Sequence, residues 1–149
     1  VWTNAKWNEL CAAVALEGLE KFDETFARRR KIRARLLEGL KSLEEHRLIL
    51  YHDDPGEVIS PHAFPIVLKD ERDDISDLRA HLEQASIQTK SLFGSLPTQH
   101  KAFAFLGHKL GDFPVAERIG RAGLHFGYNE FMTDDDADYV VETLREFFR

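Results

Sequence analysis

The longest uninterrupted pattern in the chain is a proline-free stretch over residues 8–43 in which apolar side chains recur at helical spacing. The residues that make this pattern are Leu10, Val14, Leu16, Leu19, Phe22, Phe26, Ile32, Leu36, Leu40 and Leu43. The pattern predicts one long helix or two nearly collinear helices. At about 1.5 Å of rise per residue the helix would reach roughly 50 Å, more than a compact domain of this size needs for its own packing. We therefore expect residues 1–45 to form a long interdomain helix.

The remaining residues, 46–149, alternate short strands with helices. Period-two patterns and turn residues predict strands near 47–52, 62–69, 87–90 and 124–127. Caps and helical spacing predict helices over 75–85, 114–122 and 134–148, with a loop over 91–100. Pro65 lacks the N–H that a strand donates, which predicts an edge position or a bulge. The expected fold is α+β, a small, mostly antiparallel sheet covered by helices.

Composition excludes several classes of partner. The chain has 149 residues, 43% of them hydrophobic, which suits a single domain with its own core. No apolar run approaches the roughly 20 residues that span a bilayer, so we expect no membrane partner. The formal net charge of −6 opposes nucleic-acid binding, and we expect the basic run over 28–35 to be a solvated helix surface. The single cysteine, Cys11, fits a reducing compartment, and the expected location is cytoplasmic.

Common metal and catalytic motifs are absent from the sequence. The seven histidines show no tight H-x-x-x-H spacing, so we expect no bound metal. The acidic triplet over 134–136 follows Thr133, and helix capping explains it without calcium. There is no phosphate-binding glycine loop and no G-x-S-x-G nucleophile. Physical chemistry alone indicates two polar segments, residues 3–9 and 89–100, as the functional surfaces.

Several blocks of the sequence resemble one enzyme family. The opening T-N-A-K-W-N-E-L over 3–10, followed by Ala12 and Ala13, matches G-x-N-x-(R/K)-M-x-E-(L/M/F)-x-A-A. L-E-K-F-D over 19–23, H-A-F-P over 62–65, GDFPVAE over 111–117 and D-Y-V-V over 138–141 follow in family order. With these blocks the chain resembles the DegT/DnrJ/StrS family of pyridoxal-phosphate (PLP) dependent sugar-nucleotide aminotransferases over almost its whole length.

The resemblance implies the C-terminal small domain of a fold-type I PLP enzyme. In such an enzyme a large domain supplies the Schiff-base lysine, which we expect upstream of Val1 and absent from this chain. The parent would transfer an amino group from an amino acid, with glutamate the expected donor, to a keto group on a nucleotide-linked deoxysugar. It would be a homodimer with its site shared between subunits. This chain alone would carry no catalytic residue and would be inactive.

The same resemblance gives roles to individual residues. Asn4 matches the asparagine that reaches the cofactor phosphate in the neighbouring subunit, and a neutral amide can donate hydrogen bonds to phosphate oxygens. Lys6 matches a basic position suited to the diphosphate of the nucleotide-sugar substrate. Lys90 and His100 in the polar loop, and Tyr128 in the G-Y-N-E turn, are further substrate-binding candidates.

One departure from the family keeps a second function open. Leu92-Phe93-Gly94 replaces the histidine and tyrosine that follow this strand in many family aminotransferases. The run I-Q-T-K-S-L-F-G over 87–94 instead resembles the sugar 3-dehydrases, in which a histidine replaces the Schiff-base lysine. A 3-dehydrase domain is therefore one alternative, and a non-catalytic dimerisation or regulatory module is another. If a large domain packs on this chain, the long helix should expose an apolar patch and the chain should self-associate.

Overall fold

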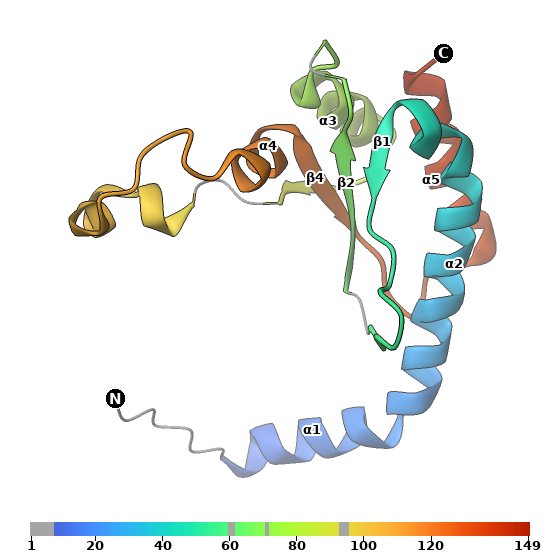
Figure 1. Cartoon of the computed structure of the whole chain (residues 1–149). Coiled ribbons are helices and arrows are strands. Elements are labelled where there is room, and N and C mark those ends of the chain that lie inside the picture. The colour runs from blue at the N-terminus through green and yellow to red at the C-terminus, as the bar shows by residue number, and fades with distance from the viewer. Residues whose placement is uncertain (1–7, 60–61, 71, 93–95) are drawn as a thin grey trace.

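The computed structural model describes residues 8–59, 62–70, 72–92 and 96–149. A four-stranded antiparallel sheet forms the centre, with long helices against one face and a short helix against the other (Figure 1). The N-terminal helix and the segment 97–112 project away from this body. The predicted α+β class and antiparallel sheet are confirmed. Within the described ranges, no helix is both long enough and apolar enough to cross a bilayer.

The predicted long helix is interrupted at Lys21. Helix α1 spans Glu9–Glu20 and helix α2 spans Phe22–His46, and Lys21 between them has φ −96° and ψ 3°. Figure 1 shows α1 leaving α2 at a steep angle, so the expectation of collinear helices is wrong. The buried side chains of α2 begin at Ile32, and α1 has none. Among the described residues α1 buries no side chain, so little packing on the body holds it in line with α2.

The sheet has the strand order β1-β2-β4-β3, and every neighbouring pair is antiparallel. Its strands are β1 (Leu48–Leu50), β2 (Ala63–Leu68), β3 (Thr89–Ser91) and β4 (Gly123–Gly127). Pro65 therefore lies in an inner strand, whereas the sequence predicted an edge position or a bulge. However, β1 pairs with β2 only from Ile66 onward, so Pro65 has no strand neighbour on that side. A residue without an N–H is tolerated there because no ladder bond has to form with β1.

Alternate strand residues build the core on one face of the sheet. Phe64 and Phe126 are register partners on β2 and β4, and their rings stack with centroids 5.3 Å apart. Against this face pack α2, α3 (Ile75–Gln84) and α5 (Asp134–Phe147). The helices α2 and α5 approach closely at Gly39, where an added Cβ would lie 2.6 Å from Val141 Cγ2. A glycine at this position lets the two helix backbones come together.

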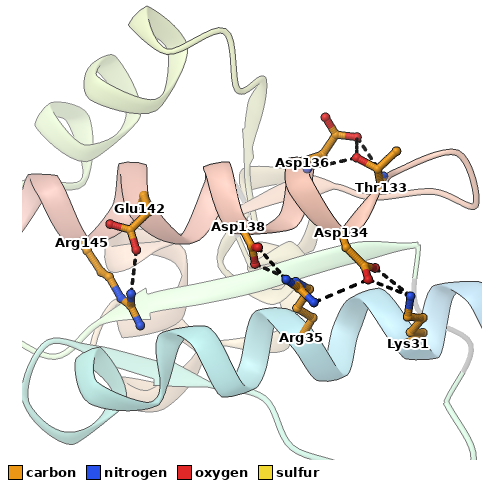
Figure 2. A network of polar contacts seen from close by, with 8 residues as sticks. All are labelled: Lys31, Arg35, Thr133, Asp134, Asp136, Asp138, Glu142 and Arg145. Carbon is orange, nitrogen blue, oxygen red and sulfur yellow. Dashed lines mark hydrogen bonds and ion pairs between the residues drawn. The ribbon is translucent and has the colours of Figure 1, made fainter.

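Ion pairs join the basic run of α2 to the acidic start of α5 (Figure 2). Arg35 binds Asp138 at 2.6 Å and Lys31 binds Asp134 at 2.8 Å. Thr133 and Asp136 form a reciprocal capping box at the start of α5, so helix capping is confirmed for the acidic triplet. The basic run is mostly exposed, as the prediction of a solvated surface requires, and Lys31 and Arg35 within it also pair with α5. Exposed pairs of this kind contribute about 0–1 kcal/mol each, and their main effect here is to fix how the helices align.

Candidate functional site

The face of the sheet opposite α2 and α5, called the open face from here on, carries Lys90 and His125 side by side, a pair called the polar row. His125 of β4 pairs with Lys90 of β3 on one side and with Pro65 of β2 on the other. Successive strand residues point to opposite faces, and the neighbours Leu124 and Phe126 face the core, so this row faces outward. Register therefore places an ammonium group beside an imidazole on a surface that the helical core leaves open.

The imidazole in this row is held towards its neutral form. Burial is the largest cause that lowers the pKa of His125, and the nearby positive groups of His62 and Lys90 lower it further. A neutral imidazole presents one N–H donor and one nitrogen acceptor. Together with the Lys90 ammonium, the row offers a charged donor and a neutral donor to a ligand. Such a pair suits an anionic group such as a phosphate or a carboxylate.

An apolar hollow of about 570 Å³ adjoins this row at Pro65, the register partner of His125. Its walls come from β1, β2, α4 and the residues that directly follow β1 and β3. They are Ile49, Leu50, Tyr51, Pro65, Val67, Leu92, Pro114, Val115, Arg118 and Ile119. The charged group among them, Arg118, donates to the Lys69 carbonyl at 2.9 Å. The hollow therefore suits a nonpolar group, with the polar row at its border.

Helix α4 (Pro114–Ala122), which borders this hollow, ends at Gly123, the first residue of β4. A Cβ built at Gly123 would lie 2.4 Å from the Ile119 carbonyl oxygen and 2.6 Å from Leu92 Cδ1. Pro114 occupies the first turn of α4, where its missing N–H costs no hydrogen bond. Local sequence thus starts the helix, and the glycine lets the chain turn directly from the last turn of α4 into β4.

A buried carboxylate holds the segment before α4. Glu117 Oε1 accepts hydrogen bonds from Gln99 Nε2 at 2.5 Å, Gly111 N at 2.8 Å and Phe113 N at 3.2 Å. The Gln99 amide is the main cause that lowers the pKa of Glu117; the two backbone N–H groups add to this, and burial opposes it. The GDFPVAE block therefore has a structural role, in which its glutamate closes the base of residues 97–112.

Residues 97–112, called the arm from here on, contain the short helices η1 (Pro97–Gln99) and η2 (Lys101–Leu106). The arm extends away from the sheet in Figure 1, and every residue from His100 to Asp112 is exposed. His100 lies between η1 and η2, where its N–H donates to the Pro97 carbonyl at 3.0 Å. The predicted site residue His100 is thus exposed near the base of the arm and is not part of the polar row.

Tyr128 lies in the core instead of on the surface. Its residue is 3% exposed, and its ring packs edge-on against Phe64 with centroids 6.5 Å apart. Burial raises the pKa of Tyr128 to about 12, and its hydroxyl has no hydrogen-bond partner among the described residues. Tyr128 also borders a polar hollow of about 670 Å³ with Arg29, His62, Gln88 and Asn129. The Arg29 guanidinium in that hollow is already paired with Glu130 at 3.0 Å.

The structure does not bring the predicted site residues together. Lys90 is on the open face, His100 is on the arm, Tyr128 is in the core, and Asn4 and Lys6 lie outside the described residues. Sequence reasoning missed His125, although the alternation in G-L-H-F-G over 123–127 puts it on the face opposite Leu124. Across the described ranges, no group of three or more His, Cys, Asp or Glu side chains is arranged to hold a metal ion.

The described lysines all lie at the surface of this chain. A Schiff-base lysine is activated by desolvation or by a neighbouring cation in a closed site. Each of the described lysines is exposed: Lys21, Lys31, Lys41, Lys69, Lys90, Lys101 and Lys109. In this chain their exposed ammonium groups fit contacts to a ligand at its surface.

Comparison with known proteins places the chain in a family. Residues 1–145 match the DegT/DnrJ/EryC1/StrS aminotransferase family. The dTDP-4-dehydro-2,6-dideoxy-D-glucose 3-dehydratase of Saccharopolyspora spinosa is 34% identical over 152 residues, which cover 97% of this chain and 31% of that enzyme. S. venezuelae DesV, solved in complex with a ketimine intermediate, matches with a TM-score of 0.85 and 26% identity, covering 97% of this chain and 38% of DesV.

A second solved structure has the same fold at lower identity. GDP-4-keto-6-deoxymannose-3-dehydratase, with a trapped PLP-glutamate geminal diamine, matches with a TM-score of 0.78 and 20% identity over 97% of this chain and 38% of that chain. The chain spans about a third of the length of these relatives. The match over residues 1–145 nevertheless covers nearly all of its own sequence. The chain belongs to the DegT/DnrJ/EryC1/StrS aminotransferase family.

Proposed function

We propose that this chain is the C-terminal small domain of a PLP-dependent aminotransferase. The parent enzyme would move an amino group from an amino acid, glutamate being the proposed donor, to a nucleotide-linked keto-deoxysugar. The observation that carries the proposal is the family match over residues 1–145, and the fold similarity to DesV supports it. In this proposal a large domain outside the sequence holds PLP, which supplies the electron sink for amino transfer when bound. The parent is proposed to be a cytoplasmic homodimer in nucleotide-sugar biosynthesis.

The contribution of this chain would be to bind and orient the substrate. The polar row of Lys90 and His125 suits an anionic diphosphate, and the adjoining apolar hollow suits a deoxygenated or flat group. A nucleotide-linked deoxysugar has both kinds of group in one molecule. Asn4 and Lys6 keep their proposed contacts with the cofactor phosphate and the substrate diphosphate. His100 stays a predicted substrate contact from the arm, and Tyr128 stays one from the border of the polar hollow.

A sugar 3-dehydrase is the second candidate, and a specific observation favours it. The run over 87–94 resembles that group, and the 34% identical relative is itself a 3-dehydratase. Both candidates would use a PLP-type cofactor and a nucleotide sugar, and they differ in the bond that changes. An aminotransferase replaces the carbonyl oxygen by an amino group, whereas a dehydrase removes a hydroxyl group.

The experiment that tests the proposal uses the product of the complete gene. The protein is incubated with PLP, glutamate and a nucleotide-linked 4-keto-6-deoxysugar, and products are followed by mass spectrometry and by 2-oxoglutarate release. An aminotransferase forms one aminated sugar for each 2-oxoglutarate. A sugar that loses its hydroxyl without keeping nitrogen contradicts the aminotransferase and supports the dehydrase. No conversion of any keto-sugar supports the non-catalytic module.

The same assay tests the polar row. Lys90→Gln in the complete protein removes the ammonium, and we expect the KM for the sugar nucleotide to rise at least tenfold with kcat nearly unchanged, because a uniform binding contact is lost. Lys41→Gln is the matched control, since Lys41 is also exposed and lies on α2. Equal KM values for the two variants would remove Lys90 from the proposed site.

A further inference from the structure

The apolar hollow and the polar hollow lie at opposite ends of β4, with the polar row between them. Val67, which lines the apolar hollow, pairs with Gly123, the first residue of β4. Gly127, the last residue of β4, lines the polar hollow. His125 lies midway between these two glycines and pairs with Lys90. Strand register therefore gives the order apolar hollow, cationic row, polar hollow along one strand.

The Gly127 end of β4 leaves room for a ligand. A Cβ built at Gly127 would have no described residue within 4 Å apart from its chain neighbours, and the residue is exposed. Strand β3 begins at Thr89, which pairs with Phe126, so within the described ranges β4 has no β3 partner from Gly127 onward. A strand edge without a partner presents backbone N–H and C=O groups. A polar ligand can therefore approach the backbone closely at this glycine.

The arginine and the aspartate that line the polar hollow are already paired. The Arg29 guanidinium binds Glu130 at 3.0 Å. The Asp136 carboxylate accepts hydrogen bonds from the N–H and the hydroxyl of Thr133 at 2.8 Å and 2.7 Å. A charged ligand group that leaves water is costly unless it gains a partner of opposite charge. The hollow therefore suits a neutral group better than a phosphate or an ammonium group.

Neutral donors and acceptors line the same hollow. Gln88 carries an amide and His62 an imidazole, and both residues are exposed. The side-chain oxygen of Asn129 accepts from the N–H groups of Phe131 and Met132, which leaves its NH2 group to donate to a ligand. Amides and a neutral imidazole both donate and accept, as the hydroxyl groups of a sugar require.

We propose that the polar hollow is the subsite for the sugar ring of the nucleotide-linked substrate, with Gln88, His62 and Asn129 as its contacts. The ligand lies along β4, with its flat base in the apolar hollow, its diphosphate on the polar row and its sugar beyond Gly127. This order of zones is also the order of the three groups in a nucleotide sugar. His125 and Gly127 are two strand residues apart, about 7 Å, so the sugar subsite adjoins the diphosphate. The inference rests on the proposed function, whose diphosphate contact it extends.

Ligands with and without a sugar separate this subsite from the polar row. Isothermal titration calorimetry on the product of the complete gene gives Kd for dTDP and dTDP-glucose, UDP and UDP-glucose, and GDP and GDP-mannose. The pair that the wild-type protein binds most tightly is then used for the variants. Gly127→Leu fills the open space, so Kd for the sugar conjugate should rise about tenfold or more, while Kd for the nucleoside diphosphate stays within about twofold. Lys90→Gln should raise both Kd values.

A milder variant keeps the test valid if Gly127→Leu disturbs folding. Gln88→Ala removes one amide contact and should raise Kd for the sugar conjugate about fivefold, the usual effect of one hydrogen bond, with the nucleoside diphosphate unaffected. Gln84→Ala, an exposed position at the end of α3, is the matched control and should leave both Kd values unchanged.

Three outcomes overturn the subsite. The first is equal weakening of the sugar conjugate and the nucleoside diphosphate by Gly127→Leu, because the diphosphate would then lie over this glycine. The second is unchanged affinity for the sugar conjugate in both Gly127→Leu and Gln88→Ala, because the sugar would then lie outside the hollow. The third is a wild-type protein that binds none of the six ligands. The product assay decides the proposed function separately, so amino transfer without the expected Kd pattern removes the subsite alone.

Discussion

The Cβ position of Gly123 lies 2.4 Å from the carbonyl oxygen of Ile119, closer than any side chain at 123 allows. Because that oxygen belongs to the backbone of α4, a larger residue has to move the helix. We predict that Gly123→Ala lowers the free energy of unfolding by about 1–3 kcal/mol, the usual range for overpacking. Gly127→Ala, in the same strand with nothing within 4 Å of its Cβ, should change it by less than about 0.5 kcal/mol. Urea titration measures both, and equal effects would refute the close approach.

The contrast between α2 and α1 gives a second prediction. Leu36 is fully buried between α2 and the sheet, so Leu36→Ala should cost about 2–5 kcal/mol of unfolding free energy through a cavity. Leu16 on α1 is 58% exposed, and Leu16→Ala should cost less than about 0.5 kcal/mol under monomeric conditions. A large loss for Leu16→Ala in the monomer would mean that α1 packs on the body.

We predict that the Glu117 carboxylate fixes the conformation of the backbone between the arm and α4. Glu117→Ala removes the acceptor for the Gly111 and Phe113 N–H groups, so amide exchange at these two residues should accelerate at least tenfold by NMR. Glu146→Ala, an exposed position on α5, is the control and should leave both rates unchanged.

The same carboxylate gives a pH dependence. The pKa of Glu117 is lowered by folding, so its stabilising effect is complete above the ordinary carboxyl pKa and is lost as pH falls through the lowered value. Protection of Gly111 and Phe113 should therefore fall on acidification below the ordinary carboxyl range. Protection lost only on alkalinisation would contradict this account.

The buried hydroxyl of Tyr128, which has no hydrogen-bond partner among the described residues, gives a prediction about stability. Because its hydroxyl is buried and unpaired, Tyr128→Phe should leave stability unchanged or raise it by about 1 kcal/mol. In an alkaline absorbance titration, the phenol that ionises near pH 12 should disappear in this variant. A loss of several kcal/mol would show that the hydroxyl has a partner in solution.

Local sequence signals predicted much of the fold. Alternation predicted the strands around Phe64 and Phe126, and Thr133 with its acidic neighbours predicted the start of α5. These elements form for reasons contained in a few adjacent residues. The break at Lys21 was not predictable in the same way, because apolar spacing continues across it and no proline marks it.

The site was less predictable because its parts meet through strand register. Lys90 and His125 are far apart in sequence, and only the β3–β4 pairing makes them neighbours. Likewise, the basic run of α2 finds its acidic partners on α5, about a hundred residues later. Tyr128 looked like a polar turn residue, yet its ring fills the core beside Phe64.

Borohydride reduction of the complete protein, purified with PLP and followed by peptide mapping, tests the central claim most directly. The account predicts that reduction fixes the cofactor to one lysine outside the 149 residues described by this sequence. It also predicts that no lysine of this chain carries the label, since those described are exposed. Cofactor bound without any lysine linkage would contradict the aminotransferase and favour the dehydrase. A label on Lys90 or any other lysine of this chain would contradict the proposal that the large domain supplies the Schiff-base lysine.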